Sequence, residues 1–424
     1  MKKAIQFLVF STLSFIVNSQ ENIPLKKNVL FIGNSYTAVN NLPLMTSTLS
    51  LSAGDTLTFD SHTPGGMTFE GHSTNQTVID KIAQANWDFV VLQEQSQRPS
   101  FDDNQVQAEV FPFAKKLDSM INFYNPCAET IFYMTWGRQN GDAGNCPFWP
   151  PVCTYQGMDS LLYLRYMQLA DTNDAIVSPV GKLWNYLRIN NPTINLYSPD
   201  ESHPSLAGTY AAACSFYTTI FKKNPQLITD NYGVSQVDAE IIRNAAKLIV
   251  FDSLQNWFQG AYEPQADFTF TSVGNLEVEF TNLSTFADSY NWNFGDQTNP
   301  ITTENAIHLF PTYGSYEVRL IVEKCGKWDT LKIIITIENP SANITENSKE
   351  AFRISPNPVQ DYLNLEFIEG EFTYSIYQLD GKIVKSQKLN SKESICLIGL
   401  DKSIYLLKIH QNNKLIFEDR FVKE

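Results

Sequence analysis

The sequence predicts a three-layer α/β domain followed by two all-β units. From residue 27 to about 259, short apolar runs such as "DFVVLQ" and "TIFYMTW" alternate with helical stretches, as expected of a parallel sheet that helices cover on both faces. Beyond Tyr262 the runs become short strands of alternating polarity, such as "LEVEFTN" and "SYEVRLIVE", which favour a β-sandwich. A chain of 424 residues is also longer than chains that fold around a single hydrophobic core.

The elements of the α/β domain follow from these runs. Strands are expected at 28–33, 56–61, 88–93, 129–135 and 174–178. Helices are expected at 42–53, 77–85, 105–124, 158–170, 180–190, 206–222 and 237–259. In open sheets of this kind, ligands bind at the carboxyl ends of the strands.

The N-terminus has the pattern of a signal peptide. Lys2 and Lys3 precede an apolar run that ends at Val17, and Val17 and Ser19 suit the cleavage positions. We therefore expect a signal peptide over 1–19 and an exported mature protein. No later segment reaches about 18 apolar residues, so a membrane span is not expected.

The rest of the chain divides by composition. We expect the α/β domain over 20–260, the sandwich over 264–338, a polar linker over 339–350 and a second all-β unit over 351–424. The net charge of −14, from 31 basic and 45 acidic residues, argues against a nucleic-acid partner.

The six cysteines can form disulfides in an exported protein. Cys146 and Cys153 flank "PFWPPV" and are the favoured pair, whereas Cys127 and Cys214 are only one possible second pair. Cys325 and Cys396 fall in different expected domains and are expected to be free. No cysteine or histidine group has zinc spacing, so no metal is expected.

Three residues are candidates for acyl-transfer chemistry. Ser35 directly follows the first expected strand, in "NVLFIGNSYT". A serine nucleophile needs a base, usually a histidine held by a carboxylate, and His203 follows Asp200 by three residues in "SPDESHPS". This loop precedes the helix at 206–222 and can reach the carboxyl end of the first strand. The alternatives are that Ser35 only caps a helix and that Asp200 and His203 are ordinary loop residues.

"FIGNSYT" followed far downstream by "DESHP" resembles the SGNH (GDSL-like) hydrolases, a family of esterases with a flavodoxin-like fold. The resemblance implies that Ser35 is the nucleophile and that Asp200 and His203 complete the triad. It implies an oxyanion hole made by the Ser35 amide, the Gly66 amide and a side-chain amide after the third strand. This chain has "VVLQEQSQ" where the family has Gly-x-Asn-Asp, so Gln95 takes the last role, with Gln93 as the alternative.

A long insertion, residues 135–158, follows the fourth expected strand. Loops of this length are usually functional or disordered, and the expected Cys146–Cys153 bridge favours order. We interpret it as a wall of the substrate cleft, with Trp136, Arg138 and Trp149 as substrate contacts, or else as a structural flap.

The two C-terminal units also resemble known families. Residues 264–338 are similar to a PKD domain through "YNWNFGD" and "YGSYEVRLIV", which places Trp292 and Phe294 in the core. Residues 351–424 are similar to the C-terminal sorting domain of type IX secretion through "ISPNP", "YQLDGKIV" and "GLDKSIYLLKI". The second resemblance implies recognition by the type IX machinery and export across the outer membrane, to the cell surface or beyond it.

Together these features predict a secreted serine esterase that needs no cofactor. The expected substrates are O-acyl, especially acetyl, groups on carbohydrate. Two alternatives remain, a lipase-like esterase and a surface protein that binds polysaccharide or protein on an inactive hydrolase scaffold.

Overall fold

The computed structural model describes residues 23–274, 276–338, 353–366, 372–379, 381–389, 394–411 and 414–424. The expected signal peptide, 1–19, and the expected linker, 339–350, lie outside the described residues. The chain divides into two compact units, one ending at Ile337 and the other beginning at Glu338.

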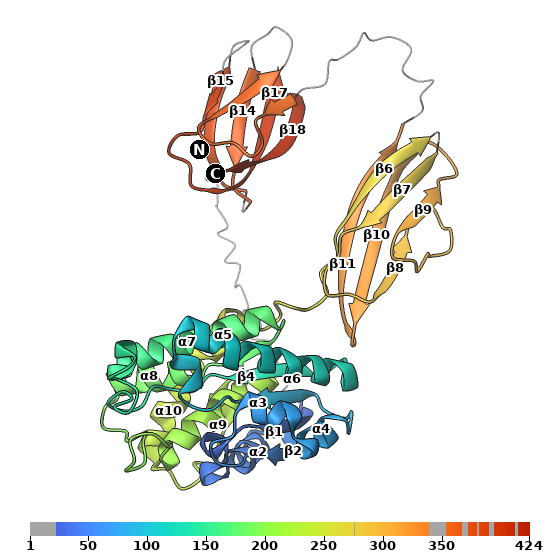
Figure 1. The fold of residues 1–424 in the computed structure, drawn as a ribbon. Helices are drawn as coiled ribbons and strands as arrows, with labels where there is room; N and C mark the ends of the chain where they lie inside the picture. Colours follow the sequence, from blue (N-terminus) through green and yellow to red (C-terminus); the bar gives the residue numbers. More distant parts are fainter. Residues whose placement is uncertain are drawn as a thin grey trace, which may run out of the picture. The chain divides into compact units, whose positions relative to one another are not determined.

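A five-stranded parallel sheet forms the centre of the α/β domain (Figure 1). Its strands are β1 (Lys26–Ile32), β2 (Thr56–His62), β3 (Phe89–Leu92), β4 (Glu129–Tyr133) and β5 (Ile176–Ser178). Their order, β2-β1-β3-β4-β5, is the flavodoxin-like order. In this order, β2 is added on one side of β1, and β3 to β5 are added on the other side. The carboxyl ends of β1 and β3 lie side by side, because Ile32 pairs with Leu92.

Ten α-helices accompany this sheet in the described part of the domain. They are α1 (Ser35–Ala38), α2 (Leu42–Ser52), α3 (Phe69–Thr74), α4 (Gln76–Ile82), α5 (Asp103–Glu109), α6 (Phe111–Tyr124), α7 (Tyr155–Thr172), α8 (Val180–Asn190), α9 (Leu206–Phe221) and α10 (Gln236–Ile249).

Each face of the sheet has its own hydrophobic core, because successive side chains of a strand point to opposite faces. In β1, Val29 and Phe31 enter one core, and Leu30 and Ile32 enter the other. Helices α2, α8, α9 and α10 complete the first core, and α3 to α7 complete the second. The structure confirms the expected three layers.

Two stretches that were each expected to form one helix are divided in the structure. The stretch 105–124 is two helices, α5 and α6, because Pro112 in the first turn of α6 has no N–H to donate to the preceding turn. The stretch 237–259 is α10 followed by a 3₁₀ segment, Phe251–Trp257. There the Trp257 indole N–H donates to Ile249 O at 2.9 Å, a carbonyl at the end of α10.

A β-sandwich follows the α/β domain. One antiparallel sheet has the order β6-β7-β9 and the other the order β11-β10-β8. The strands are β6 (Phe268–Gly274), β7 (Glu277–Asn282), β8 (Ser289–Asn293), β9 (Ala306–Leu309), β10 (Gly314–Lys324) and β11 (Lys327–Ile337). Trp292 and Phe294 are buried between the sheets, which confirms their expected core positions.

The unit that begins at Glu338 is also antiparallel. Its four-stranded sheet has the order β15-β14-β17-β18, and its three-stranded sheet has the order β12-β13-β16. The strands are β12 (Arg353–Ser355), β13 (Tyr362–Glu366), β14 (Phe372–Tyr377), β15 (Ile383–Leu389), β16 (Ile395–Cys396), β17 (Ser403–Gln411) and β18 (Lys414–Lys423). Buried Tyr374, Leu407 and Phe421 belong to its core. The expected fold class is therefore confirmed for all three parts.

The structure forms two disulfides among the described cysteines. Cys146 pairs with Cys153, as expected. Cys127 pairs with Cys325 rather than with Cys214, so both the suggested Cys127–Cys214 pair and the free Cys325 were wrong. Cys214 is buried and unpaired within α9. The sequence could not show the second pair, since 198 residues separate its cysteines.

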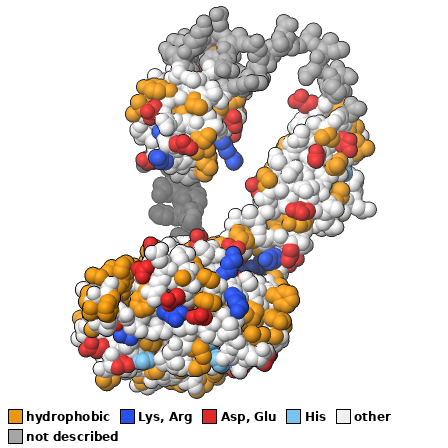
Figure 2. Space-filling model, viewed as in Figure 1, with side chains coloured by type: hydrophobic (Ala, Val, Ile, Leu, Met, Phe, Trp, Pro, Cys, Tyr) orange, Lys and Arg blue, Asp and Glu red, His pale blue; other side chains and the backbone are white. Residues whose placement is uncertain are grey.

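Charged side chains of both signs lie on the visible surface of the α/β domain (Figure 2). On the face in view, Lys and Arg side chains of the α/β domain lie among Asp and Glu side chains rather than in one basic region (Figure 2). Within the described ranges, the helices are too short or too polar to cross a bilayer.

Gly208 tests how tightly α9 packs. A Cβ atom at this position would lie 2.2 Å from Leu196 O and 2.6 Å from the Trp184 ring. We expect Gly208→Ala to lower the free energy of unfolding by about 1–3 kcal/mol through overpacking. Urea unfolding measures the loss, with Gly65→Ala as the control because a Cβ there meets nothing within 4 Å. Equal stability of the two variants would contradict the packing.

Candidate active site

Ser35 lies directly beyond the carboxyl end of β1, at the first position of α1. The Asn34 side chain caps this helix by accepting the Tyr36 N–H at 3.1 Å. Gly33 makes the turn possible, since a Cβ there would lie 2.5 Å from Thr37 Oγ1 and 2.7 Å from Gln93 Oε1. The chain therefore turns tightly and brings Ser35 to the edge of the sheet.

Gln93, at the end of β3, holds this turn. Its Oε1 accepts the Asn34 N–H and the Thr37 hydroxyl, both at 2.9 Å. Its Nε2 donates to Asn34 Oδ1 at 3.0 Å and to Glu94 O. Because Gln93 is fully buried and both amide hydrogens are engaged, the structure does not support its alternative role as an oxyanion donor.

The structure brings Ser35, His203 and Asp200 together in one hydrogen-bonded relay. His203 Nε2 lies 2.8 Å from Ser35 Oγ, and His203 Nδ1 lies 2.5 Å from Asp200 Oδ2. The other Asp200 oxygen accepts the backbone N–H groups of Ser202 and His203 at 3.1 and 2.9 Å. Burial alone would raise the pKa of Asp200, but these hydrogen bonds outweigh it and hold that pKa below its ordinary value.

The loop that carries His203 is anchored on several sides. Ser198 N–H donates to His203 O at 2.8 Å and closes the loop. Gln139 N–H donates to Glu201 O at 2.8 Å. The Tyr36 hydroxyl and Ser202 Oγ lie 2.7 Å apart. These contacts hold the imidazole in place before a substrate arrives.

Trp136 packs against the loop that carries His203. Its indole N–H donates to Ser202 O at 3.1 Å, and its ring stacks between Tyr36 and Trp184, at 4.8 and 3.7 Å between centroids. Since Trp136 is fully buried, the expected substrate contact is corrected to a supporting role. A sequence cannot distinguish a buried Trp from an exposed one in an aromatic loop.

The other two residues of the insertion have different positions. Arg138 is partly exposed and binds Asp142 Oδ1 at 3.1 Å. Burial raises the pKa of Tyr36, the residue after the nucleophile, and the positive charge of Arg138 opposes that rise. Trp149 is partly buried and donates its indole N–H to Ser100 O at 3.0 Å. Arg138 stays a predicted substrate contact, whereas Trp149 packs against the second core.

The backbone N–H groups of Ser35 and Gly66 are two of the expected oxyanion donors. The N–H of Ser35, at the first helical position, and that of Gly66 form no hydrogen bond with another residue of the described ranges. Gly66 has a φ of 68° in the exposed turn that Met67 N–H closes on Pro64 O at 3.2 Å. Asn34 Nδ2 donates to Met67 O at 3.1 Å and ties this turn to the nucleophile.

Gln95 is directed into its own loop. Its Nε2 donates to Gln97 Oε1 at 3.0 Å, and its Oε1 accepts the N–H groups of Gln97 and Arg98 at 2.9 and 3.2 Å. To act as an oxyanion donor, the Gln95 amide would have to exchange its bond to Gln97 for one to the substrate. Its role stays a prediction.

Two buried ionisable groups, His72 and Glu94, contact the segments that carry Ser35 and Gln93. His72 is fully buried, donates from Nε2 to Gly33 O at 2.9 Å and has a pKa lowered to about 4, mainly by burial. Glu94 is also fully buried and accepts the Phe69 N–H at 3.1 Å. The sequence signal for Glu94 was its place directly after an apolar strand.

No group of three or more His, Cys, Asp or Glu side chains within the described ranges is placed to share a metal ion.

Two segments match known families. Residues 262–337 match the family described as PKD domain, and residues 353–424 match the secretion system C-terminal sorting domain. These matches confirm the resemblances expected for the C-terminal units. The second indicates export by type IX secretion to the cell surface or beyond it. A search of curated proteins gives no match.

Several solved structures are similar to parts of this chain. A DUF4886 family protein from Bacteroides uniformis is 17% identical, with coverage of 54% of this chain and 95% of its own and a TM-score of 0.46. A proposed SGNH hydrolase from Slackia heliotrinireducens is 25% identical, with coverage of 46% and 99% and a TM-score of 0.38. The PKD1 domain of a Vibrio cholerae metalloprotease is 29% identical, with coverage of 18% and 99% and a TM-score of 0.17.

Glu94 makes the stability of the α/β domain depend on pH. Burial raises its pKa to about 8, against the hydrogen bonds from Gln95 and Phe69. The unfolded state therefore loses this proton at lower pH than the folded state, and stability falls as pH rises from about 4.5 to 8. We expect Glu94→Gln, which keeps an acceptor but cannot ionise, to lose less stability between pH 5 and pH 8.

Urea unfolding at the two pH values measures this difference. Glu240→Gln, at an exposed position of α10, is the control and should behave as the wild type. A Glu94→Gln variant with the wild-type pH dependence would refute the role of the buried carboxyl.

Proposed function

We propose that the α/β domain is a serine esterase that hydrolyses O-acyl groups, chiefly acetyl groups, on carbohydrate. The observation that carries the proposal is the relay of Ser35, His203 and Asp200, with 2.8 Å between Ser35 Oγ and His203 Nε2. A base at hydrogen-bond distance from a hydroxyl, and itself oriented by a carboxylate, is the arrangement that activates a serine.

The acylation step follows from this geometry. His203 Nε2 takes the Ser35 proton as Oγ attacks the ester carbonyl carbon. Asp200 holds the imidazolium that forms, through its 2.5 Å contact with Nδ1. The tetrahedral intermediate then expels the alcohol, which receives the proton from His203, and leaves the acyl group on Ser35.

Deacylation reverses the roles. Water gives a proton to His203 and attacks the acyl-enzyme, and the carboxylic acid leaves as Ser35 regains its proton. The free N–H groups of Ser35 and Gly66, with Gln95 after it turns from Gln97, would hold the oxyanion in both steps. Such donors are worth about 2.7–4 kcal/mol each in related chemistry.

The surroundings of the relay favour a polar alcohol with a short acyl group. His203 and Asp200 are 32% and 49% exposed, and the neighbouring turn with Gly66 is exposed. Polar groups lie close by, including the Tyr36 hydroxyl and Arg138. A long acyl chain would need an apolar groove, whereas an open polar rim suits an acylated glycan.

Removing the nucleophile tests the reaction. We expect Ser35→Ala to lower kcat for p-nitrophenyl acetate by roughly 10⁴-fold or more and to abolish labelling by a fluorophosphonate probe. Asp200→Asn should reduce kcat less, since Ser35 and His203 remain. A Ser35→Ala variant as active as the wild type would refute the mechanism, and an inactive wild type that the probe does not label would favour a binding protein.

Acyl-chain preference tests the substrate class. We expect kcat/KM for p-nitrophenyl esters to fall from acetate to octanoate and palmitate, because groups next to the relay, such as the Tyr36 and Ser202 hydroxyls, are polar. Acetate release from acetylated xylan and acetylated mannan, measured by an enzymatic acetate assay, should depend on Ser35. A preference for palmitate would show a lipase-like enzyme instead.

A further inference from the structure

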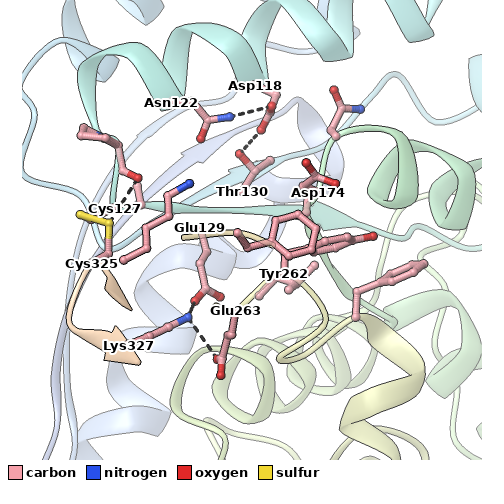
Figure 3. Close-up of a pocket in the computed structure, with 18 of the residues that line it drawn as sticks. Asp118, Asn122, Cys127, Glu129, Thr130, Asp174, Tyr262, Glu263, Cys325 and Lys327 are labelled. Atoms are coloured by element: carbon pink, nitrogen blue, oxygen red, sulfur yellow. Dashed lines mark hydrogen bonds and ion pairs between the residues drawn. A yellow bond between two sulfur atoms is a disulfide. The ribbon is translucent and has the colours of Figure 1, made fainter. Parts of the chain in front are cut away.

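A cavity of about 620 Å³ lies where the α/β domain meets the β-sandwich (Figure 3). One wall comes from α6, the start of β4 and the start of β5. The other comes from the segment around Tyr262 and from the turn between β10 and β11, with Cys325 and Lys327. Its volume is within the range of ligand-binding pockets.

This cavity is separate from the relay. It includes Glu129 and Thr130, the first residues of β4, and Ile176, the first residue of β5. Ser35 instead follows the last residue of β1. These strands are parallel. The cavity therefore lies at the amino ends of the strands, and the relay lies at their carboxyl ends.

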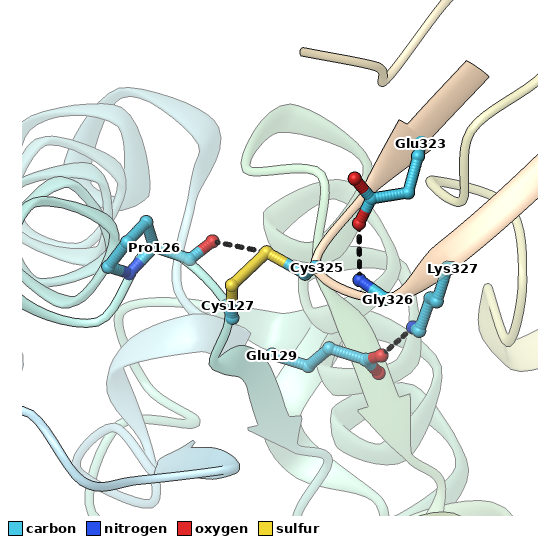
Figure 4. Close-up of a disulfide and its surroundings, with 7 residues drawn as sticks. All are labelled: Pro126, Cys127, Glu129, Glu323, Cys325, Gly326 and Lys327. Carbon is cyan, nitrogen blue, oxygen red and sulfur yellow. Dashed lines mark hydrogen bonds and ion pairs between the residues drawn. A yellow bond between two sulfur atoms is a disulfide. The ribbon is translucent and has the colours of Figure 1, made fainter. Parts of the chain in front are cut away.

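A disulfide fixes the sandwich wall of the cavity. Cys127 precedes β4, and Cys325 lies in the turn between β10 and β11 (Figure 4). Cys325 and Gly326 both have positive φ, at 55° and 76°, which a two-residue hairpin turn of this type requires. Asn or Gly would suit the first position better than Cys, so the thiol itself explains the residue.

An ion-pair group adds to this connection. Lys327 pairs with Glu129 of β4 and lies 3.2 Å from Glu263. Burial alone would lower the pKa of Lys327, but the negative charges of Glu129 and Glu263 and the hydrogen bonds to them together outweigh it and raise this pKa above its ordinary value. The lysine therefore stays charged and joins the sandwich to the α/β domain at the cavity.

The lining combines an aromatic surface with hydrogen-bonding groups. The Tyr262 ring lies 5.4 Å from Phe286 and 5.8 Å from Phe258. Around these rings, Asn122 and Asp174 also line the cavity, and Figure 3 shows them above Tyr262. Aromatic faces pack against the C–H faces of sugar rings, and amides and carboxylates bond their hydroxyls.

The lining carries charges of both signs. Some of them are paired with one another, whereas no ion pair within the described ranges involves Lys115, Asp174, Asp288 or Lys324. Lys327 is paired with two carboxylates. Asp118 is buried between the Thr130 hydroxyl at 2.6 Å and the Asn122 amide at 2.9 Å, and burial raises its pKa to about 6. Because lysines and carboxylates both line the cavity, a charged ligand would meet charges of its own sign as well as opposite ones, and a neutral polar ligand would not.

We propose that this cavity binds a neutral carbohydrate chain, with the Tyr262 ring as its stacking surface and the Cys127–Cys325 disulfide as the bond that keeps the site assembled. The site is independent of the esterase proposal and would tether a glycan at the edge of the sheet opposite to the relay.

Isothermal titration calorimetry of the full chain tests the proposal, with xylohexaose, cellohexaose and mannohexaose as probes and putrescine as the cationic comparison. We expect one site for at least one hexasaccharide. Tyr262→Ala should weaken it about tenfold or more, and Tyr262→Phe, which keeps the ring, should bind as the wild type. Asp288→Ala, at an exposed position of the lining, should weaken it several-fold, unlike Asp267→Ala outside the cavity.

The disulfide provides a second measurement. Cys127→Ser with Cys325→Ser should weaken binding, whereas Cys146→Ser with Cys153→Ser should not. Ser35→Ala should bind as the wild type while losing esterase activity, so the two proposals can fail separately. The carbohydrate site is refuted if no hexasaccharide binds, if putrescine binds more tightly than all three, or if a folded Tyr262→Ala variant binds as the wild type.

Discussion

The buried contact between Gln93 and Asn34 is the interaction on which the proposed chemistry depends. It joins the ends of two neighbouring strands, β1 and β3, by three hydrogen bonds from one side-chain amide to Asn34 and Thr37. A buried amide with all its bonds made is costly to displace, because each group would be left without a partner. The contact therefore fixes the turn of Gly33, and with it the position of the Ser35 hydroxyl and N–H.

His203 and Asp200, the other two residues of the relay, are held by different contacts. His203 lies on a loop whose closing bonds are backbone contacts and whose floor is the buried stack of Trp136 on Trp184. Aromatic stacking gives this floor rigidity at little entropic cost. Two independently rigid segments, 168 residues apart in sequence, thus meet at 2.8 Å. Pre-organisation of this kind lowers the reorganisation that catalysis would require.

The sequence was sufficient where short-range rules apply. Alternating apolar runs predicted the layers, and the turn after β1 and the Asp-x-x-His spacing pointed to Ser35, Asp200 and His203. It was insufficient where tertiary packing decides. Nothing local shows that the Gln93 amide is buried against Asn34 while the Gln95 amide turns into its own loop. Nothing local shows that Trp136 is buried either. The Cys127–Cys325 pair depends on how two domains pack, which no spacing within either domain contains.

That disulfide bears on the role of the β-sandwich. A spacer would need only a flexible connection, yet the turn between β10 and β11 is joined to the start of β4 by a covalent bond and by Lys327. Closing so long a loop limits the unfolded chain and favours the docked arrangement. The sandwich is therefore attached to the α/β domain at a second point, in addition to the chain that connects them.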